Sequence, residues 1–192
     1  MPQGVRPPLS FPLLLALAAL LFLNTCREEK MSGTELAPDF KLTFFYGDEN
    51  LNGKEIRPAD FRGKPAAIFF TASYCTTCEF MFNTLAPYRS QNFFIMSVGV
   101  LDDETRFRRK VESLEVKIPV AFDTDNMAEK YDTDILPITV FITPEGTIYK
   151  KVRGTIGHKR LERLFNELKN ANVSQSAQTS DPTPASAPAS AR

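Results

Sequence analysis

Residues 66–83, AAIFFTASYCTTCEFMFN, decide the fold. The stretch begins with an apolar run that has the length and character of a fully buried β-strand. A few small or polar residues follow, and then Cys75 and Cys78 in a C-x-x-C spacing. The apolar residues beyond the cysteines suit a helix that packs on most sides (Phe80, Met81, Phe82 and Leu85). The sequence therefore predicts a strand that delivers a dithiol to the start of a helix.

The predicted position of each cysteine indicates its chemical role. The N-terminus of a helix carries unsatisfied N–H groups and a partial positive charge, and these stabilise a thiolate, the species that attacks disulfides. Cys75 lies at the mouth of the helix, so we expect it to be exposed and to act as the nucleophile. Cys78 lies about one turn further in, so we expect it to be shielded and to resolve the mixed disulfide.

Two other interpretations of the C-x-x-C pair have less support. A zinc site needs a second pair of ligands, and the chain offers only His158 and Cys26 besides this pair. A purely structural disulfide across two residues closes too short a loop to stabilise the fold much. We therefore expect a redox pair, and we expect no metal and no cofactor.

The composition fits one globular domain with additional segments. The chain has 192 residues, of which 43% are hydrophobic and 24% are charged, and its formal net charge is zero. The sequence has no stripe of basic residues, so we expect no nucleic-acid partner. Three cysteines are an odd number, so at least one of them has no partner within the chain.

Residues 1–26 have the pattern of a targeting segment. Arg6 supplies a positive charge, and the apolar run over residues 9–23 is short for a membrane span and suits a signal sequence. The run is followed by Cys26, and this resembles the signal of a bacterial lipoprotein, although Thr25 stands where a smaller residue is usual. We expect Cys26 to be the lipid anchor, with an uncleaved membrane anchor or ordinary secretory cleavage as alternatives. All three place the domain outside the cytoplasm, and we expect the periplasmic side of a bacterial cell envelope.

The remaining pattern divides the chain into a tether (27–36), a folded domain (37–170) and a Ser/Ala/Pro-rich tail (171–192) that we expect to be disordered. Within the domain, strands are expected at 41–46, 54–56, 66–70, 93–101, 119–122, 138–142 and 147–153. Helical segments are expected at 58–64, 102–114, 125–131 and 158–169. The fold class is therefore α/β, with a mixed central sheet flanked by helices and an N-terminal β-hairpin extension.

Pro137 supplies a second element of the candidate site. It directly precedes the predicted strand 138–142, and proline marks a strand entrance because it cannot sit inside a central strand. A cis peptide bond, which is essentially confined to X-Pro pairs, would turn the backbone of Leu136 outward. An extended substrate could then pair with that backbone beside the dithiol. From the residues alone, a trans proline at the strand edge is the alternative.

The order of these motifs resembles the thioredoxin superfamily, and more narrowly the membrane-anchored, extracytoplasmic TlpA/ResA-type thiol–disulfide oxidoreductases. The resemblance covers residues 36–169 and includes APDF at 37–40, the strand before the C-x-x-C helix, TPEG at 143–146 and Gly154. It implies a thioredoxin-like fold in which Cys75 and Cys78 are catalytic and the peptide bond before Pro137 is cis. It also implies that Tyr74, Leu136 and Pro137 bind the substrate.

The resemblance implies partners as well. These are proteins with disulfides or dithiols, a redox partner that recycles Cys75–Cys78, and a membrane reached through the N-terminal anchor. Cytochrome c maturation or redox homeostasis of the envelope are the processes that it indicates.

Several positions depart from the family pattern. Tyr74 stands where relatives usually have tryptophan, and Thr77 where they usually have proline. Phe69 and Met81 occupy the positions at which thioredoxins and ResA-type proteins, respectively, carry an acid, so proton transfer to or from Cys78 has no evident internal relay. These departures leave the redox potential and the direction of electron flow open.

Two rival functions remain on the same fold. A peroxiredoxin-like peroxidase requires a threonine three residues before the attacking cysteine, where this chain has Ala72. A metal-delivery or assembly factor of the copper-binding Sco type uses C-x-x-x-C and a nearby histidine. The single histidine, His158, begins the last predicted helix, where we expect a surface or capping role. Glu79, in the first turn of the C-x-x-C helix, is expected to support the helix dipole.

Overall fold

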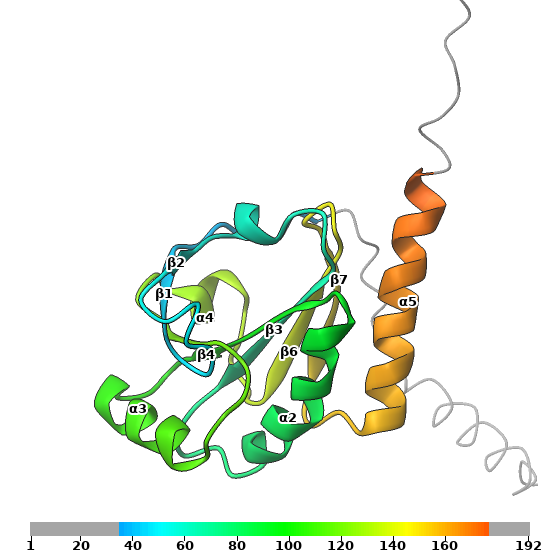
Figure 1. The fold of residues 1–192 in the computed structure, drawn as a ribbon. Coiled ribbons are helices and arrows are strands. Elements are labelled where there is room, and N and C mark those ends of the chain that lie inside the picture. The colour runs from blue at the N-terminus through cyan, green and yellow to red at the C-terminus, as the bar shows by residue number, and fades with distance from the viewer. Residues whose placement is uncertain (1–34, 177–192) are drawn as a thin grey trace, which may run out of the picture. The chain divides into compact units, whose positions relative to one another are not determined.

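A computed structural model describes residues 35–176 of the chain. Its sheet has seven strands in the order β2-β1-β5-β4-β3-β6-β7 (Figure 1). The strands are β1 Leu42–Tyr46, β2 Glu55–Ile56, β3 Ala66–Thr71, β4 Phe94–Gly99, β5 Val120–Phe122, β6 Ile138–Ile142 and β7 Ile148–Arg153. The helices are α2 Cys78–Leu85, α3 Glu104–Ser113, α4 Met127–Lys130 and α5 His158–Ser176, with 3-10 turns η1 Pro58–Phe61 and η2 Ala86–Gln91.

The strand β3 lies inside the sheet, as its apolar sequence predicts. It pairs parallel with β4 and antiparallel with β6, and β4 pairs parallel with β5. The antiparallel pairs β1–β2, β1–β5 and β6–β7 complete the sheet. A mixed sheet flanked by helices confirms the predicted fold class.

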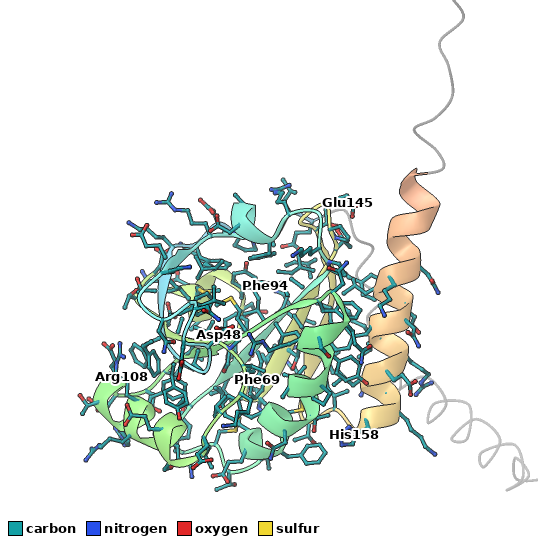
Figure 2. The ribbon with its side chains drawn as sticks, viewed as in Figure 1. Asp48, Phe69, Phe94, Arg108, Glu145 and His158 are labelled. Atoms are coloured by element: carbon teal, nitrogen blue, oxygen red, sulfur yellow. A yellow bond between two sulfur atoms is a disulfide. The ribbon has the colours of Figure 1, made fainter. Side chains whose placement is uncertain are left out.

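The side chains of β3 alternate between two cores on opposite faces of the sheet. Ala67 and Phe69 belong to the core that α2, α3 and α5 cover, and Phe69 lies in the interior (Figure 2). Ala66, Ile68 and Phe70 belong to the core on the other face, which η1 and α4 help to close. Because both faces are covered, the whole strand is buried, which is why its sequence is continuously apolar.

The helix α3 packs closely on the sheet at Gly99, the last residue of β4. A Cβ atom on Gly99 would lie 2.3 Å from the ring of Phe107, closer than real atoms approach. The buried Phe107 ring therefore needs the glycine in order to sit over the end of β4. This packing fixes the start of α3 and the short loop 100–103, which forms one wall of the candidate site.

The chain enters the described domain at one end of the sheet. The backbone N–H of Ile148 donates to the carbonyl of Glu35 at 2.8 Å, and Leu36 forms an antiparallel bridge with Thr147. In the antiparallel pair of β3 and β6, Ala66 lies opposite Ile142, whereas Phe70 lies opposite Ile138. The entry point thus lies at the end of the sheet where β3 begins, away from the turn that follows β3.

The last helix differs from its predicted extent. The sequence predicts an end at Lys169, but α5 continues to Ser176. Residues 170–176 contain neither glycine nor proline, so nothing interrupts the backbone hydrogen bonds of the helix. The predicted targeting segment with Cys26, the tether up to residue 34 and the tail from residue 177 lie outside the described residues. In the part of the chain that the structure describes, no helix has both the length and the apolar character of a membrane span.

Candidate active site

The turn after β3 carries the dithiol. Cys75 and Cys78 are joined in a disulfide, with their Cα atoms 5.3 Å apart. Cys78 begins α2 and is 1% exposed, whereas Cys75 lies in the preceding turn and is partly exposed. The backbone N–H of Cys78 donates to the carbonyl of Cys75 at 3.1 Å, which closes this turn. The two cysteines therefore differ in accessibility, with Cys75 on the outside and Cys78 shielded behind it.

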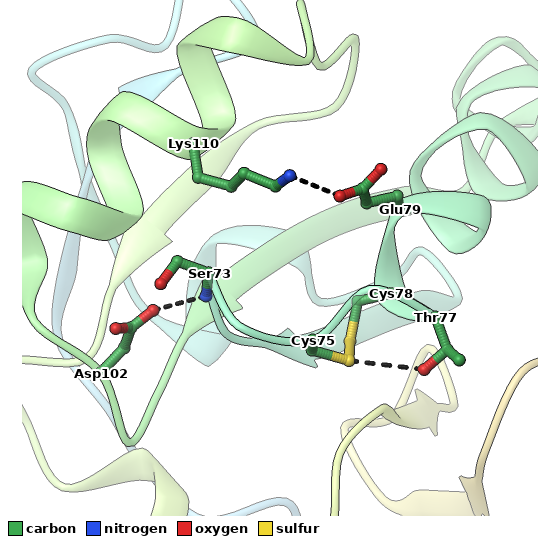
Figure 3. Close-up of a disulfide and its surroundings, with 7 residues drawn as sticks. All are labelled: Ser73, Cys75, Thr77, Cys78, Glu79, Asp102 and Lys110. Carbon is green, nitrogen blue, oxygen red and sulfur yellow. Dashed lines mark hydrogen bonds and ion pairs between the residues drawn. A yellow bond between two sulfur atoms is a disulfide. The ribbon is translucent and has the colours of Figure 1, made fainter.

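The hydroxyl of Thr77 lies beside the outer sulfur. Its Oγ1 atom is 3.6 Å from Cys75 Sγ, within hydrogen-bond range for sulfur (Figure 3). Proline, which the family resemblance predicts at this position, has neither a hydroxyl nor a backbone N–H. When the pair is reduced, the Thr77 hydroxyl can donate to a Cys75 thiolate. Thr77 thus supplies a donor that the usual proline lacks.

A buried carboxylate holds the loop after β4 against the dithiol turn. Asp102 Oδ2 accepts a hydrogen bond from the backbone N–H of Ser73 at 2.5 Å (Figure 3). Asp102 Oδ1 accepts a hydrogen bond from the backbone N–H of Asp103 at 2.8 Å. The side chain of Asp102 is 0% exposed, and Arg106 Nε lies 3.5 Å from Oδ1. The sequence pattern did not single out Asp102. The available signal was that β3 and β4 are parallel, so that the residues after both strands meet at one edge of the sheet.

Leu101 projects into solvent beside the dithiol in a left-handed backbone conformation. Its φ is 55° and the residue is 57% exposed. This conformation is unfavourable for a side chain such as leucine. The hydroxyl of Tyr74 donates to the Leu101 carbonyl at 3.3 Å, and the buried Asp102 fixes the next residue. A strained, exposed leucine held by its neighbours is typical of a functional surface.

The second predicted element also lies at this edge. The Leu136–Pro137 peptide bond is cis, as the family resemblance predicts. Leu136 is half-buried and lines a hollow of about 340 Å³ together with Tyr74 and Cys75. Pro137 is buried, and its carbonyl accepts a hydrogen bond from the N–H of Gly154 at 2.8 Å. Of the three residues predicted to bind substrate, Tyr74 and Leu136 therefore line the hollow, and Pro137 lies behind them.

Exposed apolar side chains gather around the dithiol. Within residues 35–170, whose side chains the structure describes, the large apolar side chains with high exposure are Leu36, Tyr74, Phe80, Leu101 and Ile135. All of these except Leu36 belong to the dithiol turn, the start of α2, the loop after β4 or the segment before the cis-proline. Phe80 also contacts the ring of the exposed His158, at 6.1 Å between ring centroids. An apolar concentration of this kind marks a surface that contacts another protein.

Apolar side chains occupy both positions at which the family resemblance predicts an acid. Phe69 and Met81 are 0% exposed. The sulfur of Met81 accepts a hydrogen bond from the backbone N–H of Ile156 at 3.2 Å, so Met81 joins α2 to the loop before α5. Glu79, the acid of α2, forms an ion pair with Lys110 of α3 at 2.5 Å (Figure 3). Glu79 therefore links two helices in addition to its predicted place near the helix N-terminus.

Comparison with known proteins shows the family and the fold that this chain resembles. Residues 34–151 match the AhpC/TSA family. The thiol-disulfide oxidoreductase ResA of Bacillus subtilis is 31% identical over 152 residues, which cover 77% of this chain and 82% of the relative. ResA of Geobacillus kaustophilus is 28% identical over 172 residues, which cover 86% and 95%. Among solved structures, the exposed lipoprotein thioredoxin Etrx1 of Streptococcus pneumoniae is similar with a TM-score of 0.59 at 23% identity, covering 69% of this chain and 99% of its own.

Proposed function

Because this chain belongs to the AhpC/TSA family and is a thiol–disulfide oxidoreductase with a thioredoxin-like fold, we propose that Cys75 and Cys78 are its redox pair. The observation that carries this proposal is the disulfide itself, whose outer cysteine is accessible within a ring of exposed apolar side chains. Such a surface suits a reaction with the disulfides of other proteins, because a segment of the substrate protein must contact the surface around Cys75 for its disulfide to react.

In the reducing direction, the Cys75 thiolate attacks one sulfur of a substrate disulfide. A bond forms between Cys75 and that sulfur, the substrate S–S bond breaks, and the second substrate sulfur leaves as a thiolate that takes up a proton. The Cys78 thiolate then attacks Cys75 Sγ and releases the first substrate sulfur. The substrate gains two electrons, and the redox pair loses two electrons to form the Cys75–Cys78 disulfide. The oxidising direction is the reverse sequence.

The surrounding residues support these roles in distinct ways. The N-terminus of α2 and the hydroxyl of Thr77 stabilise negative charge on the outer sulfur. The burial of Cys78 confines its attack to a sulfur already bonded to Cys75. Tyr74 and Leu136 contact the substrate in the hollow over Cys75, and Pro137 positions Leu136.

The proposed location is the periplasmic side of a bacterial cell envelope, with the domain tethered through its N-terminus. Residues 1–26 support this location because their pattern is that of a signal ending at a lipidated Cys26. The similar Streptococcus protein is itself described as an exposed lipoprotein. In an oxidising compartment, a reductant must be re-reduced by a redox partner. Cytochrome c maturation or envelope redox homeostasis are the processes proposed for it.

The test is to trap substrates with Cys78→Ser, which leaves the mixed disulfide on Cys75 unresolved. Cys75→Ser is the matched control, since it removes the nucleophile and retains Cys78 and Cys26. We expect proteins that are released by a reducing agent to accumulate on the Cys78→Ser variant only. Equal recovery on both variants would contradict the assigned roles, because the adducts would then form on another cysteine. Loss of a lipid-sized mass increment in Cys26→Ser tests the anchor separately.

A further inference from the structure

A second hollow adjoins the one over the dithiol. Its volume is about 530 Å³, and its walls come from the loop after β4, the end of β5 and the segment 126–134. Leu101 and Asp134 line both hollows. The two hollows therefore lie next to each other, one over Cys75 and the other beyond Leu101, and together we call them the groove.

The walls of the second hollow carry negative charge. Within the described residues its lining contains no lysine, arginine or histidine, and its carboxylates are Asp102, Asp123, Glu129, Asp132 and Asp134. Arg106 lies 3.5 Å from Asp102, and Arg153 lies 3.8 Å from Asp132 and 3.5 Å from Asp134. Two cations against five carboxylates leave the hollow with an excess of negative charge. Among the described residues, no group of three or more histidine, cysteine, aspartate or glutamate side chains is placed to hold a metal ion. The excess of negative charge favours a basic side chain on a bound segment.

The boundary between the two hollows is apolar and held in place. Leu101 is fixed there by the Tyr74 hydroxyl and by the buried Asp102. Ile135, also exposed, lies between Asp134 and Leu136, which line the groove. Water leaves these side chains only if another apolar surface covers them. A segment that reaches Cys75 along the groove therefore passes an apolar boundary before it meets the carboxylates.

We propose that the groove binds an extended segment of the substrate protein that carries a lysine or arginine close to its reacting cysteine. This inference rests on the proposed function, because the segment must present its sulfur to Cys75. Leu101 and Tyr74 cover an apolar part of the segment, and Asp132 and Asp134 receive the basic side chain. Complementary charge raises the association rate and rejects acidic segments.

The test uses the full chain, reduced, with peptides whose single cysteine is in a mixed disulfide with thionitrobenzoate, the release of which is measured by absorbance. The peptides differ from one another at a single position, which carries Lys, Gln or Glu. This position is placed in turn at each site from three residues before the cysteine to three residues after it. Cys75 attacks the peptide sulfur and thionitrobenzoate leaves. On one side of the cysteine we expect the Lys peptide to react roughly tenfold faster than the Glu peptide at low salt, and we expect high salt to reduce this ratio.

The variant Asp132→Asn/Asp134→Asn should bring the Lys-to-Glu ratio close to one, and any change in rate that all the peptides share cancels in this ratio. Glu145→Gln is the control. Glu145 is exposed and lies at the opposite end of the domain from His158 (Figure 2), whose ring contacts Phe80 beside the dithiol. Its loss of charge should therefore keep the wild-type ratio. This inference alone would be overturned if the wild-type protein reacted fast and at equal rates with all the peptides. It would also be overturned if the double variant left the Lys-to-Glu rate ratio unchanged. No reaction with any peptide would overturn the proposed function as well.

Discussion

The carboxylate of Asp102 and the backbone N–H of Ser73, 2.5 Å apart, join the loop after β4 to the turn that leads to Cys75. Asp102→Ala should lower the free energy of unfolding by about 1.5–3 kcal/mol, because it leaves that N–H without its charged acceptor. Asp102→Asn retains an acceptor oxygen, so its free energy of unfolding should fall less than that of Asp102→Ala. Denaturant unfolding of the two variants measures the difference. Equal losses would show that the negative charge matters more than the hydrogen bond.

Removal of the Thr77 hydroxyl should slow the reaction of the outer sulfur. Thr77→Val keeps the shape of the side chain but cannot donate to a Cys75 thiolate. A hydrogen bond to a charged sulfur is worth about 1.5 kcal/mol in thiolate formation. The higher intrinsic nucleophilicity of a less stabilised thiolate offsets about half of this effect, so alkylation of the reduced protein at neutral pH should be roughly threefold slower. Thr77→Ser should keep the wild-type rate. If the valine and serine variants react equally fast, the hydroxyl has no role at Cys75.

The sulfur of Met81 should contribute to stability beyond its apolar volume. Met81→Leu leaves the N–H of Ile156 without its acceptor in the core, so the free energy of unfolding should fall by about 1–3 kcal/mol. Met96→Leu makes the same exchange at a buried position in the opposite core and should cost less than about 1.5 kcal/mol. Thermal or urea unfolding compares the two. A smaller loss for Met81→Leu than for Met96→Leu would contradict the sulfur–amide contact.

The stability of the protein should fall in alkaline solution because of Tyr131. Burial raises the pKa of Tyr131 well above its ordinary value, and its hydroxyl donates to the carbonyl of Pro38 at 2.8 Å. The unfolded chain releases the Tyr131 hydroxyl proton at about pH 10, whereas the folded chain keeps it at that pH. The contribution of the protonated Tyr131 hydroxyl to the free energy of unfolding is therefore fully present below about pH 10 and is lost as the pH rises further.

Tyr131→Phe provides the measurement for this pH dependence. The variant should be less stable at neutral pH by about 1 kcal/mol because it lacks the hydrogen bond, but its stability should decline less above about pH 10. Urea midpoints of the reduced protein between about pH 8 and 11 compare the two slopes. Parallel decline of variant and wild type would assign the alkaline loss to other groups.

The fold was largely predictable because local patterns and tertiary burial agree along the chain. β3 is covered on both faces, and its sequence is continuously apolar as a result. The predicted end of α5, Lys169, was wrong by several residues, because a polar sequence without proline or glycine contains no signal that ends a helix. Such boundaries depend on backbone hydrogen bonds that composition does not reveal.

The site was predictable only where a short motif carries it. The C-x-x-C spacing points to Cys75 and Cys78, which the structure joins in a disulfide, and the proline before a strand points to Pro137, whose preceding peptide bond is cis. Leu101 and Asp134 gave no such signal, since they come together only where several loops meet to line the two hollows. The left-handed conformation of Leu101 is also contrary to the preference of leucine, so no local pattern predicts it.

The entry of the chain beside Thr147 determines how an anchored form of this protein would work. Glu35 and Leu36 join the sheet at the end where β3 begins, while Cys75 lies beyond the end where β3 finishes. An N-terminal anchor of the kind proposed above would therefore be joined to the domain through Glu35, at the end of the sheet away from Cys75.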